Sequence, residues 1–113
     1  MRNYIQPGEN MTFTAPGGGV VSGNGYLIGS LFVIATLTAD AGDQFVGLTV
    51  GVVSYTKPGS QAWTEGVKVY WDDGAKKMTT TSSGNTLVGV AAEAVGSGAG
   101  ETTGKVRLDG VAR

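Results

Sequence analysis

Cysteine and histidine are both absent from this chain of 113 residues. Without them the chain cannot form disulfides, Cys/His zinc sites, a cysteine nucleophile or a Ser-His-Asp triad. The commonest general base near neutral pH is missing as well. An enzyme of this composition would have to work with carboxylates, lysine, tyrosine or serine alone. The sequence therefore predicts a protein that is not an enzyme and has no catalytic, cofactor-binding or metal-binding residues.

Charge and long apolar runs are also scarce. Charged residues make up 15% of the chain, and eight basic against nine acidic side chains give a net charge of −1. Because neutralising phosphates requires a basic surface, we expect no nucleic-acid partner. The longest apolar run, Leu31 to Ala35, is far shorter than the ~20 residues of a membrane-spanning helix. We expect no membrane partner, and no signal peptide is recognisable, so we expect the protein in a cytoplasm.

Glycine, in contrast, is abundant, at 20 of the 113 residues. A glycine inside a strand costs roughly 0.5–1 kcal/mol relative to alanine. We therefore expect most glycines to lie in turns, and burial against other subunits to offset the cost of the rest.

The stretch from Ala62 to Ala92 carries both tryptophans and has the clearest strand pattern. Val67, Val69 and Trp71 alternate with Lys68, Tyr70 and Asp72, the period-2 signature of a strand with two unlike faces. Asp73-Gly74 suits a two-residue hairpin turn. The expected unit is an antiparallel meander of three strands: 67–72, 77–81 and 86–92.

The most apolar segment, Leu31 to Leu37, is rich in β-branched residues and has no strict alternation. This composition predicts a strand that is buried on both faces. A short buried helix is the alternative, because periodicity alone does not separate the two.

A long strand is expected from Phe45 to Tyr55. Gly47, Thr49 and Gly51 would share one of its faces, opposite a face of larger apolar residues. Because small residues in a row allow another backbone to approach closely, this face is a candidate subunit interface.

The N-terminal segment is a second candidate interface. Met11 and Phe13 alternate with polar residues, and the turn-forming run Pro-Gly-Gly-Gly at 16–19 follows. We interpret residues 1–15 as a possible N-terminal strand or arm and residues 16–19 as a glycine-rich hinge within one all-β domain of residues 1–113. Tyr4 and Ile5 belong to the same candidate interface.

Three groups of side chains could suggest chemistry. Gly100 to Lys105 resembles the end of a phosphate-binding loop, but Ala99 stands at its first glycine position and Val106 at its Ser/Thr position. The adjacent carboxylates of Asp72 and Asp73 would point to opposite faces of a strand, and we expect Asp73 to serve the turn. The aromatic residues Trp63, Tyr70 and Trp71 could stack on a sugar, but more often such residues fill a core or an interface.

Several segments, in order along nearly the whole chain, resemble a family of small tailed-phage and prophage proteins. They are N-Y-I-Q-P-G to G-S-L-F (Asn3 to Phe32), A-W-T-E-G-V-K-V-Y-W-D (Ala62 to Asp72), G-N-T-L-V-G-V-A (Gly84 to Ala91) and G-K-V-R-L-D-G (Gly104 to Gly110). The family, long filed as a domain of unknown function, is regarded as capsid cement or decoration proteins. Some members carry automated labels as recombinase-like proteins.

The resemblance implies an all-β subunit, a small antiparallel barrel or sandwich with an extended N-terminal segment. It implies a homotrimer on the outside of the phage head, bound to the major capsid protein and made in the host cytoplasm. It implies no catalysis, and it supplies no binding residues to carry over. The alternative function is a virion surface module that recognises a host glycan or protein through exposed aromatic residues.

Overall fold

The computed structural model describes residues 10–111, which form nine strands and no helix. The described residues therefore contain no apolar helix long enough to cross a membrane. The strands are β1 (Asn10–Thr14), β2 (Gly25–Ile28), β3 (Leu31–Ala35), β4 (Gln44–Leu48), β5 (Val50–Thr56), β6 (Lys68–Asp72), β7 (Lys77–Thr79), β8 (Thr86–Ala91) and β9 (Thr103–Asp109). The predicted all-β class is confirmed.

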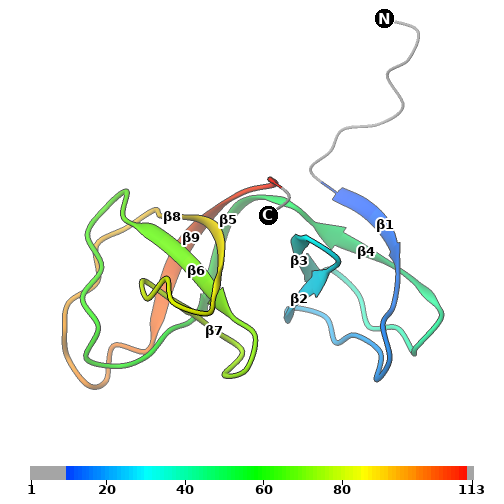
Figure 1. Ribbon diagram of the computed structural model, residues 1–113, viewed down its shortest axis with the longest axis horizontal. Coiled ribbons are helices and arrows are strands. Elements are labelled where there is room, and N and C mark those ends of the chain that lie inside the picture. Colours follow the sequence, from blue (N-terminus) through cyan, green and yellow to red (C-terminus); the bar gives the residue numbers. More distant parts are fainter. Residues whose placement is uncertain (1–9, 112–113) are drawn as a thin grey trace, which may run out of the picture.

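The strands form two antiparallel sheets that lie side by side as two lobes (Figure 1). The first sheet has the order β1-β4-β3-β2, and the second has the order β5-β9-β8-β6-β7. The second sheet curls, so that its two edge strands, β5 and β7, approach each other. The molecule is elongated, with extents of 45 × 36 × 23 Å.

Strand β3 is buried on both faces, and the alternative of a short helix is wrong. Phe32 and Ile34 belong to one hydrophobic cluster, whereas Val33 and Ala35 belong to the other. Successive side chains of a strand point to opposite faces, so an apolar strand without alternation can separate two cores. β3 is therefore the layer between the two cores of the molecule.

The core between the sheets is built around Trp71 of β6. Its ring lies 4.9 Å from the ring of Phe32, which belongs to the first sheet, and 5.4 Å from the ring of Tyr55 on β5. The Tyr55 hydroxyl also accepts a hydrogen bond of 2.8 Å from the backbone N–H of Gly25 on β2. Aromatic packing and this hydrogen bond thus both contribute to the contact between the two sheets.

The long strand expected from Phe45 to Tyr55 is divided at Thr49. β4 belongs to the first sheet and β5 to the second, so the chain must change direction between them. Gly51 has a φ of 125°, a conformation essentially restricted to glycine. This glycine lets the chain leave one sheet and enter the other within a few residues.

The three strands of the predicted meander exist, but their order in space is different. β6 lies between β7 and β8, whereas a meander would place β7 in the middle. Val69 and Trp71 of β6 are almost completely buried, as expected of a central strand. The chain crosses from β7 to the far side of β6 through residues 80–85.

The turn after β6 also differs from the prediction. Asp72 pairs with Lys77, which leaves a four-residue loop, and Lys76 rather than Gly74 takes a positive φ, of 57°. The Asp72 carboxylate accepts hydrogen bonds from the N–H groups of Gly74 and Ala75, each 3.1 Å. An aspartate that bonds to the backbone two or three residues ahead is a common way to build such a turn.

Several glycines inside the strands make room for aromatic rings of the same chain. A Cβ atom at Gly104 would overlap the ring of Trp63, and one at Gly25 would lie 2.5 Å from the ring of Phe32. Because each glycine admits a large ring, the burial of that ring offsets the cost of a glycine in a strand. In this way packing within the subunit compensates for part of the glycine content.

Candidate functional site

The predicted interface residues that the structure describes are spread over three strands and the junction between two of them. Met11 and Phe13 lie on β1, where both are half-buried, and their neighbours Thr12 and Thr14 are exposed. The Phe13 ring packs 5.8 Å from that of Phe45 on β4. Tyr4 and Ile5 lie outside the described residues.

Strand β1 is an edge of the first sheet. It pairs with β4 from Asn10↔Leu48 to Thr14↔Gln44, and no described strand pairs with its other side. Proteins usually protect such an edge with charged residues, proline or a bulge, but the sequence N-M-T-F-T has neither charge nor proline. β1 therefore offers unpaired backbone groups beside a partly exposed apolar face.

The run at 16–19, predicted as a hinge after the N-terminal segment, forms a turn that is packed against a neighbouring loop. The N–H of Gly19 donates to the carbonyl of Pro16 over 2.9 Å. A Cβ atom at Gly19 would lie 2.6 Å from the carbonyl oxygen of Ala39. Only the part of the predicted arm before Asn10 lies outside the described residues, and the rest is an integral strand of the first sheet.

Gly47, Thr49 and Gly51 do not share an exposed face. Gly47 is covered by side chains of the same chain, because a Cβ atom there would lie 3.0 Å from Val33 and 3.1 Å from Phe13. Thr49 is buried, and only Gly51 is exposed. The expectation of one common face fails because the chain changes sheets at Thr49, between Gly47 on β4 and Gly51 on β5. A place for Gly51 in an interface stays a prediction.

The two tryptophans of the proposed stacking platform, Trp63 and Trp71, are part of the core. Trp63 and Trp71 are each 1% exposed, and Tyr70 is half-buried. The Trp63 indole N–H donates to the side chain of Gln61 over 2.9 Å. A sugar cannot stack on rings that the protein itself covers, so the basis for glycan recognition through exposed tryptophans is wrong.

The segment that resembles a phosphate-binding loop runs into β9 and not into a helix. Gly104 is buried against Trp63, and Lys105 pairs with Glu93 over 3.3 Å on the surface. No helix N-terminus exists among the described residues to hold a phosphate there.

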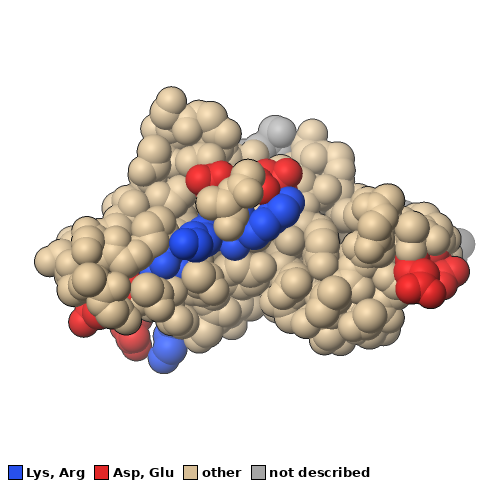
Figure 2. Space-filling view, turned by 90° about the horizontal axis from the view of Figure 1, so that it is seen from below, with Lys and Arg blue, Asp and Glu red and all other residues tan. Residues whose placement is uncertain are grey.

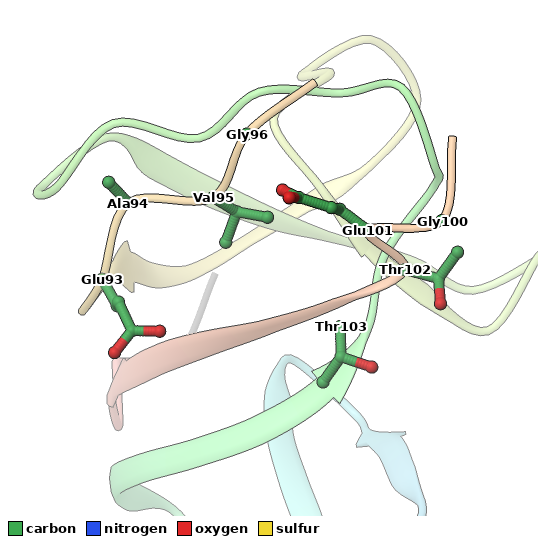
Figure 3. A pocket seen from close by; sticks show the side chains of 8 residues that line it. All are labelled: Glu93, Ala94, Val95, Gly96, Gly100, Glu101, Thr102 and Thr103. Carbon is green, nitrogen blue, oxygen red and sulfur yellow. The ribbon is translucent and has the colours of Figure 1, made fainter. Parts of the chain in front are cut away.

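An open hollow of about 410 Å³ lies at one end of the second sheet, beside this segment. Figure 3 shows that the Glu101 side chain extends across it toward Val95 and Gly96. The remaining lining residues are mainly small or polar, and no group of three potential metal ligands is found in residues 10–111. Its apolar lining is limited to Ala94 and Val95, less than the predominantly apolar lining that is usual for a small-molecule site.

Sequence reasoning missed Lys57, which is completely buried. Its ammonium group donates to the carbonyl oxygens of Pro58 and Glu101, over 2.7 and 2.9 Å, and lies 5.6 Å from the centre of the Trp63 ring. These contacts join the loop after β5 to the loop before β9. No local pattern could have indicated this burial, because one acceptor is a backbone carbonyl 44 residues away.

The two adjacent aspartates have separate structural roles. The Asp73 carboxylate accepts hydrogen bonds from Lys76 Nζ at 2.9 Å and from the Trp71 indole at 3.0 Å. These two hydrogen bonds hold the pKa of Asp73 below its usual range, and the bond from Lys76 has the larger effect. The prediction that Asp73 serves the turn needs correction, because Asp72 bonds to the turn backbone and Asp73 fastens Trp71 and Lys76.

Comparisons with known proteins identify a family for this chain. A family model described as phage cement protein matches residues 5–108, which is most of the chain. No curated protein and no solved structure matches it. The match agrees with the resemblance found in the sequence and supports a role as capsid cement. The chain therefore belongs to the phage cement protein family.

Proposed function

We propose that this cement protein binds the outer surface of a phage head as a homotrimer and stabilises the head. Its partners are then its own copies and the major capsid protein, which it meets in the host cytoplasm during assembly. The role is structural, without catalysis. The observation that carries the proposal beyond family membership is the unprotected edge of β1.

An edge strand binds a partner by extending the sheet. Main-chain hydrogen bonds provide affinity whatever the partner's sequence, and side chains on alternate positions provide specificity. On β1 these positions are Met11 and Phe13, which are half-buried in the isolated subunit and can lose their remaining exposure to a partner. Residues 1–9 precede this strand, and Tyr4 and Ile5 stay predicted interface residues.

Electron microscopy of heads assembled with and without the protein tests the proposal. We expect trimeric density on the outside of the shell at its local three-fold positions, and DNA release at a higher temperature when the protein is bound. Heads that gain no density and release DNA unchanged on heating or chelation would contradict the proposal.

Two variants of β1 test the edge itself. Met11→Glu places a charge on the apolar face of the strand, whereas Thr14→Glu places the same charge on the exposed opposite face. We expect Met11→Glu to lose binding to heads and Thr14→Glu to retain it. Equal binding of both variants would exclude the apolar face of β1 from the contact.

A further inference from the structure

The charged side chains are distributed unevenly between the two lobes. Within residues 10–49 the charged side chains are Asp40 and Asp43 alone. Arg2 and Arg113 lie outside the described residues, and the six other Lys and Arg residues all lie between Lys57 and Arg107. Figure 2 shows acidic side chains at the far end of the first lobe, and on the second lobe a band of basic side chains with acidic side chains beside it. Six acidic residues between Glu65 and Asp109 accompany the six basic ones in this part of the chain.

The outer surface of the second sheet carries a row of four residues that combines charge with exposed apolar surface. The register places Lys68 opposite Val90, Val90 opposite Arg107, and Arg107 opposite Val52, so the four share one face. Val52 is 59% exposed, and it is among the most exposed large apolar side chains described. We call these four residues the basic face.

The cations of the basic face have no ion-pair partner within the described part of the chain. Two other charged groups adjoin them on β9. Lys105 is paired with Glu93, and Asp109 is a half-buried carboxylate two residues beyond Arg107. Lys68 and Arg107 thus leave a positive charge on an exposed sheet surface that contains two valines.

The end of the first lobe has the complementary composition. Asp40 and Asp43 are exposed at the two ends of one turn, and the exposed apolar residues Val21 and Leu37 lie in adjoining segments. We call these four residues the acidic tip. Its segments are joined by the Val20↔Ala39 bridge and by a hydrogen bond from Ser22 N–H to the Thr38 hydroxyl.

The acidic turn is held firmly against the rest of its lobe. The N–H of Asp43 donates to the Asp40 carbonyl over 3.0 Å. The N–H of Gly42 donates to the carbonyl of Ala15 over 3.0 Å, and the N–H of Ala15 donates to the carbonyl of Asp43 over 2.8 Å. Because the backbone is fixed by these bonds, the turn would lose little conformational freedom when a partner binds.

We propose that the basic face of one subunit binds the acidic tip of a second copy, head to tail. The basic face and the acidic tip have opposite charges, and each contains exposed apolar residues. They lie on different lobes of the same chain. Charges of this kind select the partner and fix its orientation, while apolar burial contributes to affinity. A contact between two different patches generates a closed ring when its rotation permits. The inference rests on the proposed function in one respect only, namely that the ring has three subunits.

Charge reversal tests the contact through sedimentation at low ionic strength. The variant Lys68→Glu/Arg107→Glu reverses the basic face, and Asp40→Lys/Asp43→Lys reverses the acidic tip. We expect either variant to self-associate about tenfold or more weakly than the wild type, because like charges then meet. The variant with all four substitutions restores the complementarity and should regain association, which also controls for damage to the fold.

Any of three results would overturn the proposal. The wild type could stay monomeric at millimolar concentration, or the variants with one reversed surface could associate as strongly as the wild type. The variant with all four substitutions could also stay dissociated. If reversal of the basic face abolishes head binding but leaves self-association unchanged, the face contacts the shell and the proposal also fails. In that case the cement function stands. Conversely, the charge-reversal variants could lose and regain self-association as expected although the protein does not bind to heads. That result would contradict the proposed function and leave the head-to-tail contact standing.

Discussion

The backbone N–H of Gly25 on β2 donates a hydrogen bond of 2.8 Å to the hydroxyl of Tyr55 on β5, which belongs to the other sheet. The Tyr55 ring also packs edge-on against Trp71, at 5.4 Å between ring centres. One side chain therefore contributes to the contact between the sheets both by apolar packing and by a polar bond. This arrangement allows the two contributions to be separated.

Tyr55→Phe should lower the free energy of unfolding by about 1–2 kcal/mol, because the ring remains but the N–H of Gly25 loses its acceptor in a partly buried position. Urea denaturation followed by tryptophan fluorescence measures the change. Tyr70→Phe is the matched control, since the Tyr70 hydroxyl has no hydrogen bond within residues 10–111, and its effect should stay within about 0.5 kcal/mol. Equal effects of the two substitutions would show that the bond to Gly25 is not stabilising.

Lys57→Met should destabilise the protein by about 2–4 kcal/mol. Methionine fills much the same volume, but the carbonyl oxygens of Pro58 and Glu101 lose a charged donor in a buried place. Hydrogen exchange should also become faster in the loops on either side, which the ammonium group holds together. The control Lys77→Met removes an exposed charge and should change stability by no more than about 0.5 kcal/mol. Unchanged stability of Lys57→Met would contradict the role of the buried lysine.

Local patterns in the sequence were sufficient to find most strands. The alternation around Met11 and Phe13 and around Val69 and Trp71 reflects one buried face, and the unbroken apolar run of β3 reflects two. Each of these patterns is set by the nearest neighbours in the chain and by the period of a strand. The all-β class follows from them.

Strand order and the candidate interface depended on contacts between distant residues. The pairing of β6 with both β7 and β8 leaves no local signature in the sequence. An alternating apolar pattern shows that a strand has a buried face, but it does not show which strands lie on either side of it. Small residues on one side of residues 47–51 predict a close approach by another subunit, but at Gly47 the groups that approach are Phe13 and Val33 of the same chain. A small residue indicates that something packs against it and does not identify what.

Gly104→Ala should destabilise the protein by about 1–3 kcal/mol, because the added methyl group would overlap the ring of Trp63 and force the ring or strand β9 to shift. Thermal unfolding measures the loss, and a red shift of the emission would report that Trp63 has moved toward water. Gly100→Ala is the control in the same segment. A Cβ atom there meets nothing within 4 Å, so stability should be equal or up to about 1 kcal/mol greater. A Gly104→Ala variant as stable as the control would be inconsistent with the close packing of Trp63.

The Asp73 carboxylate predicts a dependence of stability on pH. Its pKa is lowered in the folded state by the bonds from Lys76 and Trp71, so its ionised form favours folding. That contribution is fully present above the pKa of the unfolded chain, about 3.9, and is lost as the pH falls through the lower folded value. Because Asp73 and Lys76 are both more than half exposed, the ion pair itself should contribute only about 0.2–1 kcal/mol.

A double-mutant cycle with Asp73→Asn and Lys76→Met isolates this pair. Asparagine can still accept the bond from the Trp71 indole, so the cycle reports the charge interaction between Asp73 and Lys76 alone. We expect a favourable coupling energy at neutral pH that salt weakens and that is lost as the pH falls through the lowered pKa of Asp73 in the folded state. A coupling energy that stays constant from neutral to acidic pH would mean that the ionised carboxylate is not its source.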